Sequence, residues 1–171
     1  IVSSISTHIP LLKGGGMAII SGVSKTQDFE CVHNVAVIFR KLAANSAVHE
    51  IFFTDESINA VIDLVANRNT QTVLQSAAAL RDISSNPEFQ LAFVESGAMQ
   101  AAVELAVSDS DIEAKIVALG VIRHISMSMS LKTRIMRSGV ANIISRCIET
   151  SDDCDLLYQC VSSIANIAEH A

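Results

Sequence analysis

The chain has 171 residues, and half of them are hydrophobic, which is enough apolar material for one domain with its own core. Charged residues make up only 18%, and the formal net charge is −6, because 12 Lys and Arg stand against 18 Asp and Glu. These values exclude a disordered chain and argue against binding to the phosphate backbone of a nucleic acid. With two Pro, seven Gly and no Trp, the composition predicts a soluble all-α protein.

Four segments of the sequence repeat one pattern at a nearly constant spacing. Each ends in a large apolar residue, here called the anchor, which a small residue follows. The anchors are Leu42, Ile83, Ile125 and Ile167, and the distance from one to the next is the repeat period. Most positions three and six residues before an anchor are also apolar and large, and such offsets trace one face of a helix. The pattern predicts four long helices that bury this face.

The rest of each period predicts two shorter helices before the long one. A first apolar stretch covers 5–12, 48–53, 89–94 and 131–136, and a second covers 17–23, 58–65, 99–107 and 140–148. Polar breaks then follow at 24–28, 67–70, 108–111 and 150–153. Their Ser, Thr, Asn and Asp side chains are good N-caps, so each break predicts the start of a long helix.

A glycine recurs at the corner between the first and second stretches. Gly97 and Gly139 lie one period apart, Gly15 takes the matching place in the first period, and Glu56 replaces it in the second. The recurrence indicates either a positive φ or a close approach between helices, because both exclude a Cβ. If all four corners share one backbone conformation, Glu56→Gly is expected to be tolerated.

The period, the glycine corner and the order of three helices resemble the armadillo repeat family. The resemblance implies one all-α domain, a right-handed α-solenoid (an α-α superhelix) of armadillo-type three-helix repeats, in which stacked units share a core. We expect about four repeats, 3–45, 46–86, 87–127 and 128–171. HEAT repeats have a similar period, but the recurring glycine corner favours armadillo, and a non-repeat helical bundle is the alternative. Because the last segment is as apolar as the internal copies, we expect flanking repeats in a longer protein, or pairing with another chain.

No motif supports catalysis, a cofactor or a metal. The sequence has no Gly-x-Ser-x-Gly elbow, the run Gly14–Gly16 lacks the Gly-Lys-Ser/Thr of a phosphate loop, and the four Cys form no C-x-x-C pair. No stretch approaches 18 uncharged apolar residues, so membrane insertion is not expected. We therefore expect a non-enzymatic protein with reduced cysteines, located in the cytoplasm or in the nucleus.

In armadillo proteins the third helices line a concave groove where extended peptides lie. Positions one, eight and twelve residues before each anchor share one stripe of the long helix, away from the core face. Amides in this stripe can pair with a peptide backbone, and its acidic side chains favour a partner with basic residues. The predicted partner-binding groove consists of Glu30, Asn34, Lys41, Gln71, Gln75, Asp82, Glu113, Val117, His124, Asp155, Gln159 and Asn166.

The stripe is not a close match to importin-α or to β-catenin. Importin-α has a Trp five residues before the anchor, where this chain has Val37, Ala78, Gly120 and Ser162. Grooves like that of β-catenin are rich in basic residues, whereas this stripe holds one Lys. A separate row, two residues before three of the anchors, consists of Arg40, Arg81 and Arg123. These arginines are predicted either to bind an acidic partner or to cover apolar surface with the aliphatic parts of their side chains while they pair with local carboxylates.

The sequence thus favours a protein–protein interaction scaffold that binds an extended peptide or a partner protein in the groove of the third helices, with no nucleic acid and no cofactor. The alternative is a structural or assembly module, which docks into a larger complex or self-associates through uncapped apolar ends.

Overall fold

The computed structural model describes residues 9–10 and 12–169, and every regular element in this part of the chain is a helix. The third helices of the repeats are α3 (Phe29–Ala43), α6 (Thr70–Ser84), α9 (Ile112–Ser126) and α12 (Cys154–Ala168). The middle helices are α2 (Met17–Val23), α5 (Asp55–Val65), α8 (Ala98–Val107) and α11 (Val140–Thr150). The first segments are η1 (Leu12–Gly16), η2 (Ser46–Val48) with α4 (His49–Phe52), α7 (Gln90–Glu95), and η3 (Met129–Leu131) with α10 (Lys132–Arg137).

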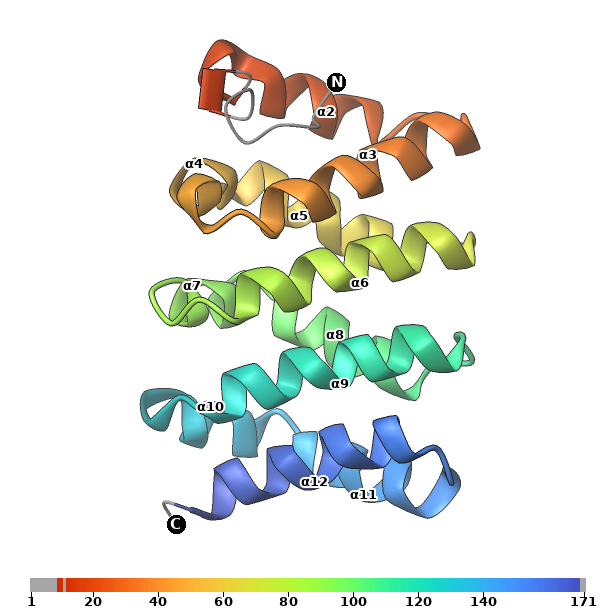
Figure 1. Cartoon of the computed structure of the whole chain (residues 1–171), viewed down its shortest axis with the longest axis vertical. Coiled ribbons are helices and arrows are strands. Elements are labelled where there is room, and N and C mark those ends of the chain that lie inside the picture. The colour runs from red at the N-terminus through yellow and green to blue at the C-terminus, as the bar shows by residue number, and fades with distance from the viewer. Residues whose placement is uncertain (1–8, 11, 170–171) are drawn as a thin grey trace.

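The repeats stack along one axis, with α2 and α12 at opposite ends of the molecule (Figure 1). The four third helices lie side by side on one face, and the middle helices α5, α8 and α11 lie behind them (Figure 1). α6 packs between α3 and α9, and α12 packs on α9. The all-α solenoid of three-helix repeats that the sequence predicts is therefore confirmed, although most of the first predicted stretch, 5–12, lies outside the described residues.

The predicted apolar face forms the core in the first three repeats. The anchors Leu42, Ile83 and Ile125 have no exposed surface, and neither has Leu80, three residues before its anchor. Full burial of such a side chain contributes ~1.5–3 kcal/mol, so this row carries much of the stability of the stack.

The same row is open on α12, at one end of the stack. Val161 is 59% exposed and Ile164 is 45% exposed, whereas the corresponding Leu119 and Ile122 on α9 are 0% and 1% exposed. The difference arises because α12 covers this side of α9, while no described helix covers the same side of α12.

All four third helices begin at the predicted polar breaks. The side chains of Asp28, Asn69 and Asp153 each accept a hydrogen bond from the backbone N–H three residues later, at 2.8, 3.0 and 2.9 Å. Asp111 accepts from the N–H of Glu113 at 2.9 Å. These bonds satisfy amides that a helix leaves unpaired at its start. The backbone N–H of Cys31 also lowers the pKa of the exposed Asp28 carboxyl below its usual value.

The glycine corners have positive φ, as one of the two predicted explanations requires. φ is 82° at Gly15, 86° at Gly97 and 78° at Gly139, and no atom lies within 4 Å of a Cβ built there. Backbone conformation rather than close packing therefore selects glycine.

The second corner is built differently, so the assumption of one shared corner backbone is wrong. Thr54 is the N-cap of α5, with an extended φ of −116°, and its hydroxyl accepts from the N–H of Ser57. Glu56 lies inside the first turn of α5. A side-chain cap replaces the left-handed glycine, so the corner gives no reason to expect that Glu56→Gly is tolerated.

A second set of periodic side chains clamps the ends of the third helices, and the sequence analysis missed it. His49 Nε2 donates to Ala43 O, Gln90 Nε2 donates to Ser84 O at 2.9 Å, and Lys132 Nζ donates to Ile167 O at 3.1 Å. Each donor follows the previous one by one repeat period. His49 and Gln90 satisfy a carbonyl at the end of the preceding third helix, whereas Lys132 satisfies one near the end of α12, in its own repeat. The shared spacing was the only available sequence signal, because the three residue types differ.

Candidate functional site

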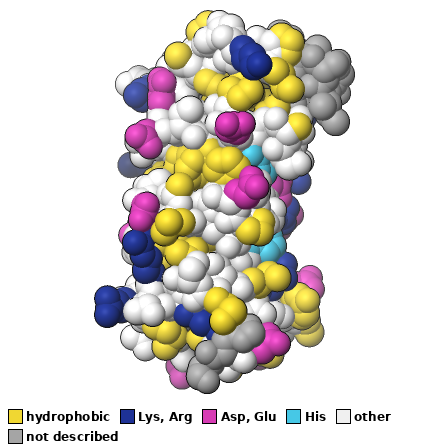
Figure 2. Space-filling model, turned by 90° about the vertical axis from the view of Figure 1, so that its left-hand side faces the viewer, with side chains coloured by type: hydrophobic (Ala, Val, Ile, Leu, Met, Phe, Trp, Pro, Cys, Tyr) yellow, Lys and Arg dark blue, Asp and Glu magenta, His cyan; other side chains and the backbone are white. Residues whose placement is uncertain are grey.

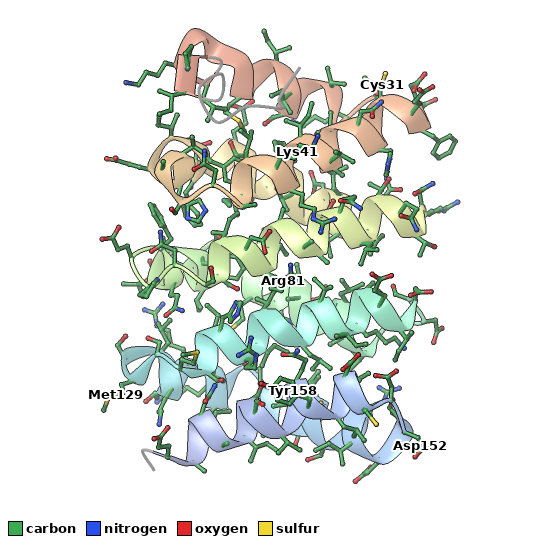
Figure 3. All side chains as sticks on the ribbon, in the orientation of Figure 1. Cys31, Lys41, Arg81, Met129, Asp152 and Tyr158 are labelled. Atoms are coloured by element: carbon green, nitrogen blue, oxygen red, sulfur yellow. The ribbon has the colours of Figure 1, made fainter. Side chains whose placement is uncertain are left out.

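The twelve predicted groove residues all belong to α3, α6, α9 and α12, and we call the exposed side of these four helices the third-helix face (Figure 3). Six of them are exposed: Glu30, Asn34, Lys41, Gln71, Glu113 and Asp155. Five are partly buried: Gln75, Asp82, His124, Gln159 and Asn166. Val117 is only 9% exposed. It therefore acts as a packing residue, and its inclusion in the predicted groove is corrected.

The amides of the face have a role that the sequence did not reveal. Arg40 Nη1 donates to Gln75 Oε1 at 2.8 Å, and Arg123 Nε donates to Gln159 Oε1 at 2.9 Å. Each bond joins a third helix to the third helix of the next repeat. Gln75 and Gln159 are therefore struts between repeats, and the amide oxygen of each already accepts a charge-assisted hydrogen bond.

The middle arginine shows why this pairing needs a glutamine. α9 has Val117 at the place that Gln75 and Gln159 hold on their helices, and a valine side chain cannot accept a hydrogen bond. Arg81 instead turns to Asp82 of its own helix, with 3.1 Å between Nη2 and Oδ1.

Two residues directly before an anchor also tie repeats together. Asn166 Nδ2 donates to Arg123 O at 3.2 Å and to Ser126 Oγ at 3.1 Å. His124 Nδ1 makes the corresponding bonds to Arg81 O at 3.2 Å and to Ser84 Oγ at 3.1 Å. Since a carbonyl oxygen only accepts, His124 carries its proton on Nδ1. Its Nε2 accepts from Arg123 Nη2 at 3.2 Å.

This environment favours the neutral form of His124. Burial lowers the pKa of the imidazole below 6.5, and the positive charge of Arg123 lowers it further. Removal from water disfavours the charged ring, and a neighbouring cation does the same. His124 and Asn166 are thus structural parts of the face, with their main polar groups already used inside the protein.

The charges of the face are separated along each helix. Glu30, Glu113 and Asp155 stand in the first turns of α3, α9 and α12, while Arg40 and Lys41, Arg81, and Arg123 stand in the last turns of α3, α6 and α9. This arrangement suits the helix dipole. The only ion pairs among the described residues are Arg81–Asp82 and Arg134–Glu95. Of the two interpretations of the arginine row, pairing with a local carboxylate holds for Arg81 alone.

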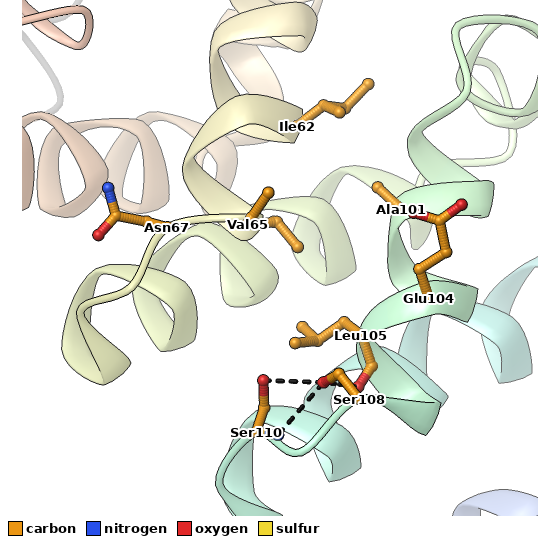
Figure 4. A pocket seen from close by; sticks show the side chains of 9 residues that line it. Ile62, Val65, Asn67, Ala101, Glu104, Leu105, Ser108 and Ser110 are labelled. Atoms are coloured by element: carbon orange, nitrogen blue, oxygen red, sulfur yellow. Dashed lines mark hydrogen bonds between the residues drawn. The ribbon is translucent and has the colours of Figure 1, made fainter.

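Other hollows offer less chemistry. One cavity of about 270 Å³ lies between the middle helices α5 and α8, away from the third-helix face. Its lining includes Ile62, Leu105 and Glu104, and Ser108 donates to Ser110 Oγ at 2.8 Å beside it (Figure 4). On the side that carries α4, α7 and α10, hydrophobic side chains form small patches between charged and polar ones (Figure 2). No three His, Cys, Asp or Glu among the described residues form a group that could hold a metal ion.

One helix pair has the length and hydropathy of a membrane span only when its members are taken together. This pair joins Ile112–Ser126 to Met129–Arg137 and is bent by 99°. No single helix in the described part of the chain passes the same test.

Solved structures with the same architecture include designed armadillo repeat proteins. One, a computationally designed protein for modular peptide recognition, has a TM-score of 0.87 and 17% identity over 99% of this chain and 72% of its own. Another, a designed armadillo repeat protein in complex with the peptide (KR)4, has a TM-score of 0.81 and 16% identity over 92% of this chain and 66% of its own.

A third similar structure comes from work on a phosphorylation switch that controls the interaction between cadherin and β-catenin. Its TM-score is 0.74 at 14% identity, and the match covers 88% of this chain but 28% of that chain. No protein-family model and no curated protein matches the sequence. The structural likeness establishes that this chain has the armadillo-repeat fold.

Proposed function

We propose that this protein is a non-enzymatic scaffold that binds an extended segment of a partner protein on its third-helix face. One observation carries the proposal: polar and charged side chains line all four stacked third helices, and Glu30, Glu113 and Asp155 among them have no ion-pair partner among the described residues. Structures of the same fold include designed proteins for peptide recognition, which supports the same assignment.

The chemistry of the acidic residues favours basic side chains in the partner. Glu30, Glu113 and Asp155, with Gln71 in the second repeat, form the acidic row at the starts of the third helices. Each exposed pair with Lys or Arg contributes ~0.2–1 kcal/mol and weakens with salt. Electrostatics then set the orientation and the association rate more than the affinity. The net charge of −6 supports a protein partner rather than a nucleic acid.

A peptide-binding experiment tests this proposal. Fluorescence anisotropy with a labelled eight-residue (Ser-Lys)4 peptide is expected to show binding that weakens as salt rises. Glu113→Lys with Asp155→Lys should reduce both the affinity and its dependence on salt. Asp63→Lys with Glu149→Lys, on the exposed surface of α5 and α11, is the matched control and should leave binding unchanged. Equal effects of the two double variants would place the interface elsewhere.

The exposed apolar row of α12 favours a second candidate, a structural or assembly module. Tyr158, Val161 and Ile164 are 60%, 59% and 45% exposed and follow one another at helical spacing. Sedimentation over a hundredfold range of concentration tests it. Association that Val161→Glu abolishes would support assembly through this row, whereas a monomer throughout would leave the third-helix face as the interface.

The four cysteines are free thiols, which supports a location in the cytoplasm or the nucleus.

A further inference from the structure

We infer that the segment bound on the third-helix face has alternating charge, with basic side chains along the acidic row and carboxylates along the arginines on the opposite side. The inference rests on the proposed function and adds the second half of the recognition chemistry.

The arginines form a preorganised row. Arg40, Arg81 and Arg123 occupy the same position on three successive third helices, two residues before the anchor of each. Arg40 and Arg123 reach across to the next repeat and are held there by Gln75 and Gln159. Arg81 also lies over the next repeat, because a Cβ at Gly120 would come within 3.3 Å of Arg81 Cδ. A side chain held in place loses less entropy when it binds a ligand.

Most of the positive charge in this row is uncompensated. A glutamine positions a guanidinium without neutralising it, so Arg40 and Arg123 keep their full charge. Lys41, next to Arg40, is exposed and has no ion-pair partner among the described residues. Only Arg81 is paired, with Asp82. Arg40, Lys41 and Arg123 therefore remain available to carboxylates from outside the chain.

The acidic row and the arginine row run parallel along the stack. Glu30 precedes Arg40 by ten residues, and Glu113 precedes Arg123 by ten. At 1.5 Å per residue the two rows are about 15 Å apart along the helix axes. An extended peptide that crosses the helices between the rows points successive side chains to opposite sides. A sequence in which basic and acidic residues alternate therefore points its basic side chains to the acidic row and its carboxylates to the arginine row, while a uniformly basic peptide points half its charges to the arginines.

Three labelled eight-residue peptides test the inference by fluorescence anisotropy at low salt: the alternating peptide (Glu-Lys)4, a block peptide of four Glu followed by four Lys, and (Ser-Lys)4. Eight residues are too short for a stable helix in water, so the comparison concerns charge order. We expect (Glu-Lys)4 to bind at least tenfold more tightly than the block peptide and at least threefold more tightly than (Ser-Lys)4. Replacement of Arg40 and Arg123 by Gln should remove the advantage over (Ser-Lys)4.

Two further variants separate recognition from folding. Lys41→Gln breaks no hydrogen bond between repeats. It should reduce the ratio of the affinities for (Glu-Lys)4 and (Ser-Lys)4 at least twofold. Arg137→Gln with Arg146→Gln, exposed on α10 and α11, removes two positive charges elsewhere, as many as the replacement of Arg40 and Arg123. This control should not change the advantage of (Glu-Lys)4 over (Ser-Lys)4. Binding of (Ser-Lys)4 as tight as that of (Glu-Lys)4 would overturn the inference and leave the proposed function intact. Failure of all three peptides to bind at millimolar concentration would overturn both.

Discussion

At the scale of single residues, two causes explain most of the repeat pattern. One is the backbone conformation that a position requires, and the other is that different side chains can make the same hydrogen bonds in different repeats. Gly97 and Gly139 recur because the corner needs a left-handed residue, and not because another atom occupies the place of a Cβ. The second repeat has a different corner, in which the extended Thr54 caps α5 with its side chain. His124 and Asn166 likewise make corresponding bonds with different side chains. The residue that one repeat uses can therefore be tested by substitution at the equivalent position of another repeat.

Alanine at two open glycine sites should have opposite effects. Neither Gly97 nor Gly22 has an atom within 4 Å of a built Cβ, but only Gly97 has positive φ. Gly97→Ala is expected to destabilise the fold by ~1–2 kcal/mol through backbone strain. Gly22→Ala, inside α2, should stabilise it by roughly 0.5–1 kcal/mol. Urea unfolding measures both, and a change of the same sign in the two variants would contradict this account.

The lowered pKa of His124 predicts a loss of stability in acid. The ring has its ordinary pKa of 6.5 in the unfolded chain and a lower one in the fold. Below pH 6.5 the unfolded state therefore binds more protons, so the free energy of unfolding falls as the pH falls from 6.5 through the folded pKa. His124→Asn should keep the bonds to Arg81 O and Ser84 Oγ and reduce this loss.

Urea unfolding of wild type and His124→Asn at pH 8, 7, 6 and 5 measures the effect. The gap in stability between the two proteins should be constant above pH 7 and shift in favour of the variant below 6.5. Parallel curves over the whole range would exclude His124 as a contributor.

Among the helices, donors from the next repeat hold the C-termini of α3 and α6, while side-chain caps begin all four third helices. His49 is 3% exposed, and its Nε2 serves the carbonyl of Ala43 at the end of α3. Gln90 does the same for Ser84 at the end of α6. Asn86 Nδ2 in turn donates to His49 Nδ1 at 3.2 Å. The end of one third helix is thus held by the first helix of the next repeat.

This equivalence predicts different costs for two substitutions of His49. His49→Ala leaves the Ala43 carbonyl without its donor and should destabilise the protein by ~1–3 kcal/mol. His49→Gln places the side chain of Gln90 at the corresponding site and should cost less than half as much. Chemical unfolding of the two variants gives the comparison, and equal losses would show that packing of the ring outweighs its hydrogen bond.

Across the full stack, each repeat is stabilised by contact with its neighbours, as expected for a solenoid. The row three residues before each anchor shows the consequence. Phe39 and Leu80 have no exposed surface and Ile122 is 1% exposed, while Ile164 on α12 is 45% exposed. The position of a repeat in the stack, rather than its own sequence, decides how much this row contributes.

The loss of stability on truncation of a side chain in this row should therefore depend on the position of its repeat in the stack. Leu80→Ala removes a fully buried side chain and is expected to cost ~2–5 kcal/mol, including the cavity that it leaves. Ile164→Ala should cost only about 1 kcal/mol at the usual 0.8 kcal/mol per buried methylene group, because nearly half of the residue's surface is already exposed to water. Thermal unfolding monitored by circular dichroism measures both. A similar cost at the two sites would mean that another chain covers α12 in solution.

Local signals in the sequence were enough to predict the fold to within a few residues at most helix ends. Helical periodicity, the N-caps at Asp28, Asn69, Asp111 and Asp153, and the recurring glycine all act over one or two turns, and each recurs with the repeat period. The second corner was the exception, because Glu56 does not show that Thr54 caps the helix in its place.

The role of the polar side chains on the face, in contrast, follows from the packing of the repeats. The sequence placed Gln75, Gln159 and Asn166 on one stripe, and their amides were predicted to be free for a peptide. The fold instead brings Arg40 within 2.8 Å of Gln75 and Arg123 within 2.9 Å of Gln159, across the boundary between repeats. A helical wheel gives the face on which a residue lies, but not which residues of the next helix come within reach. That depends on how the repeats pack, and packing determines which polar groups are used inside the protein and which charges remain for a partner.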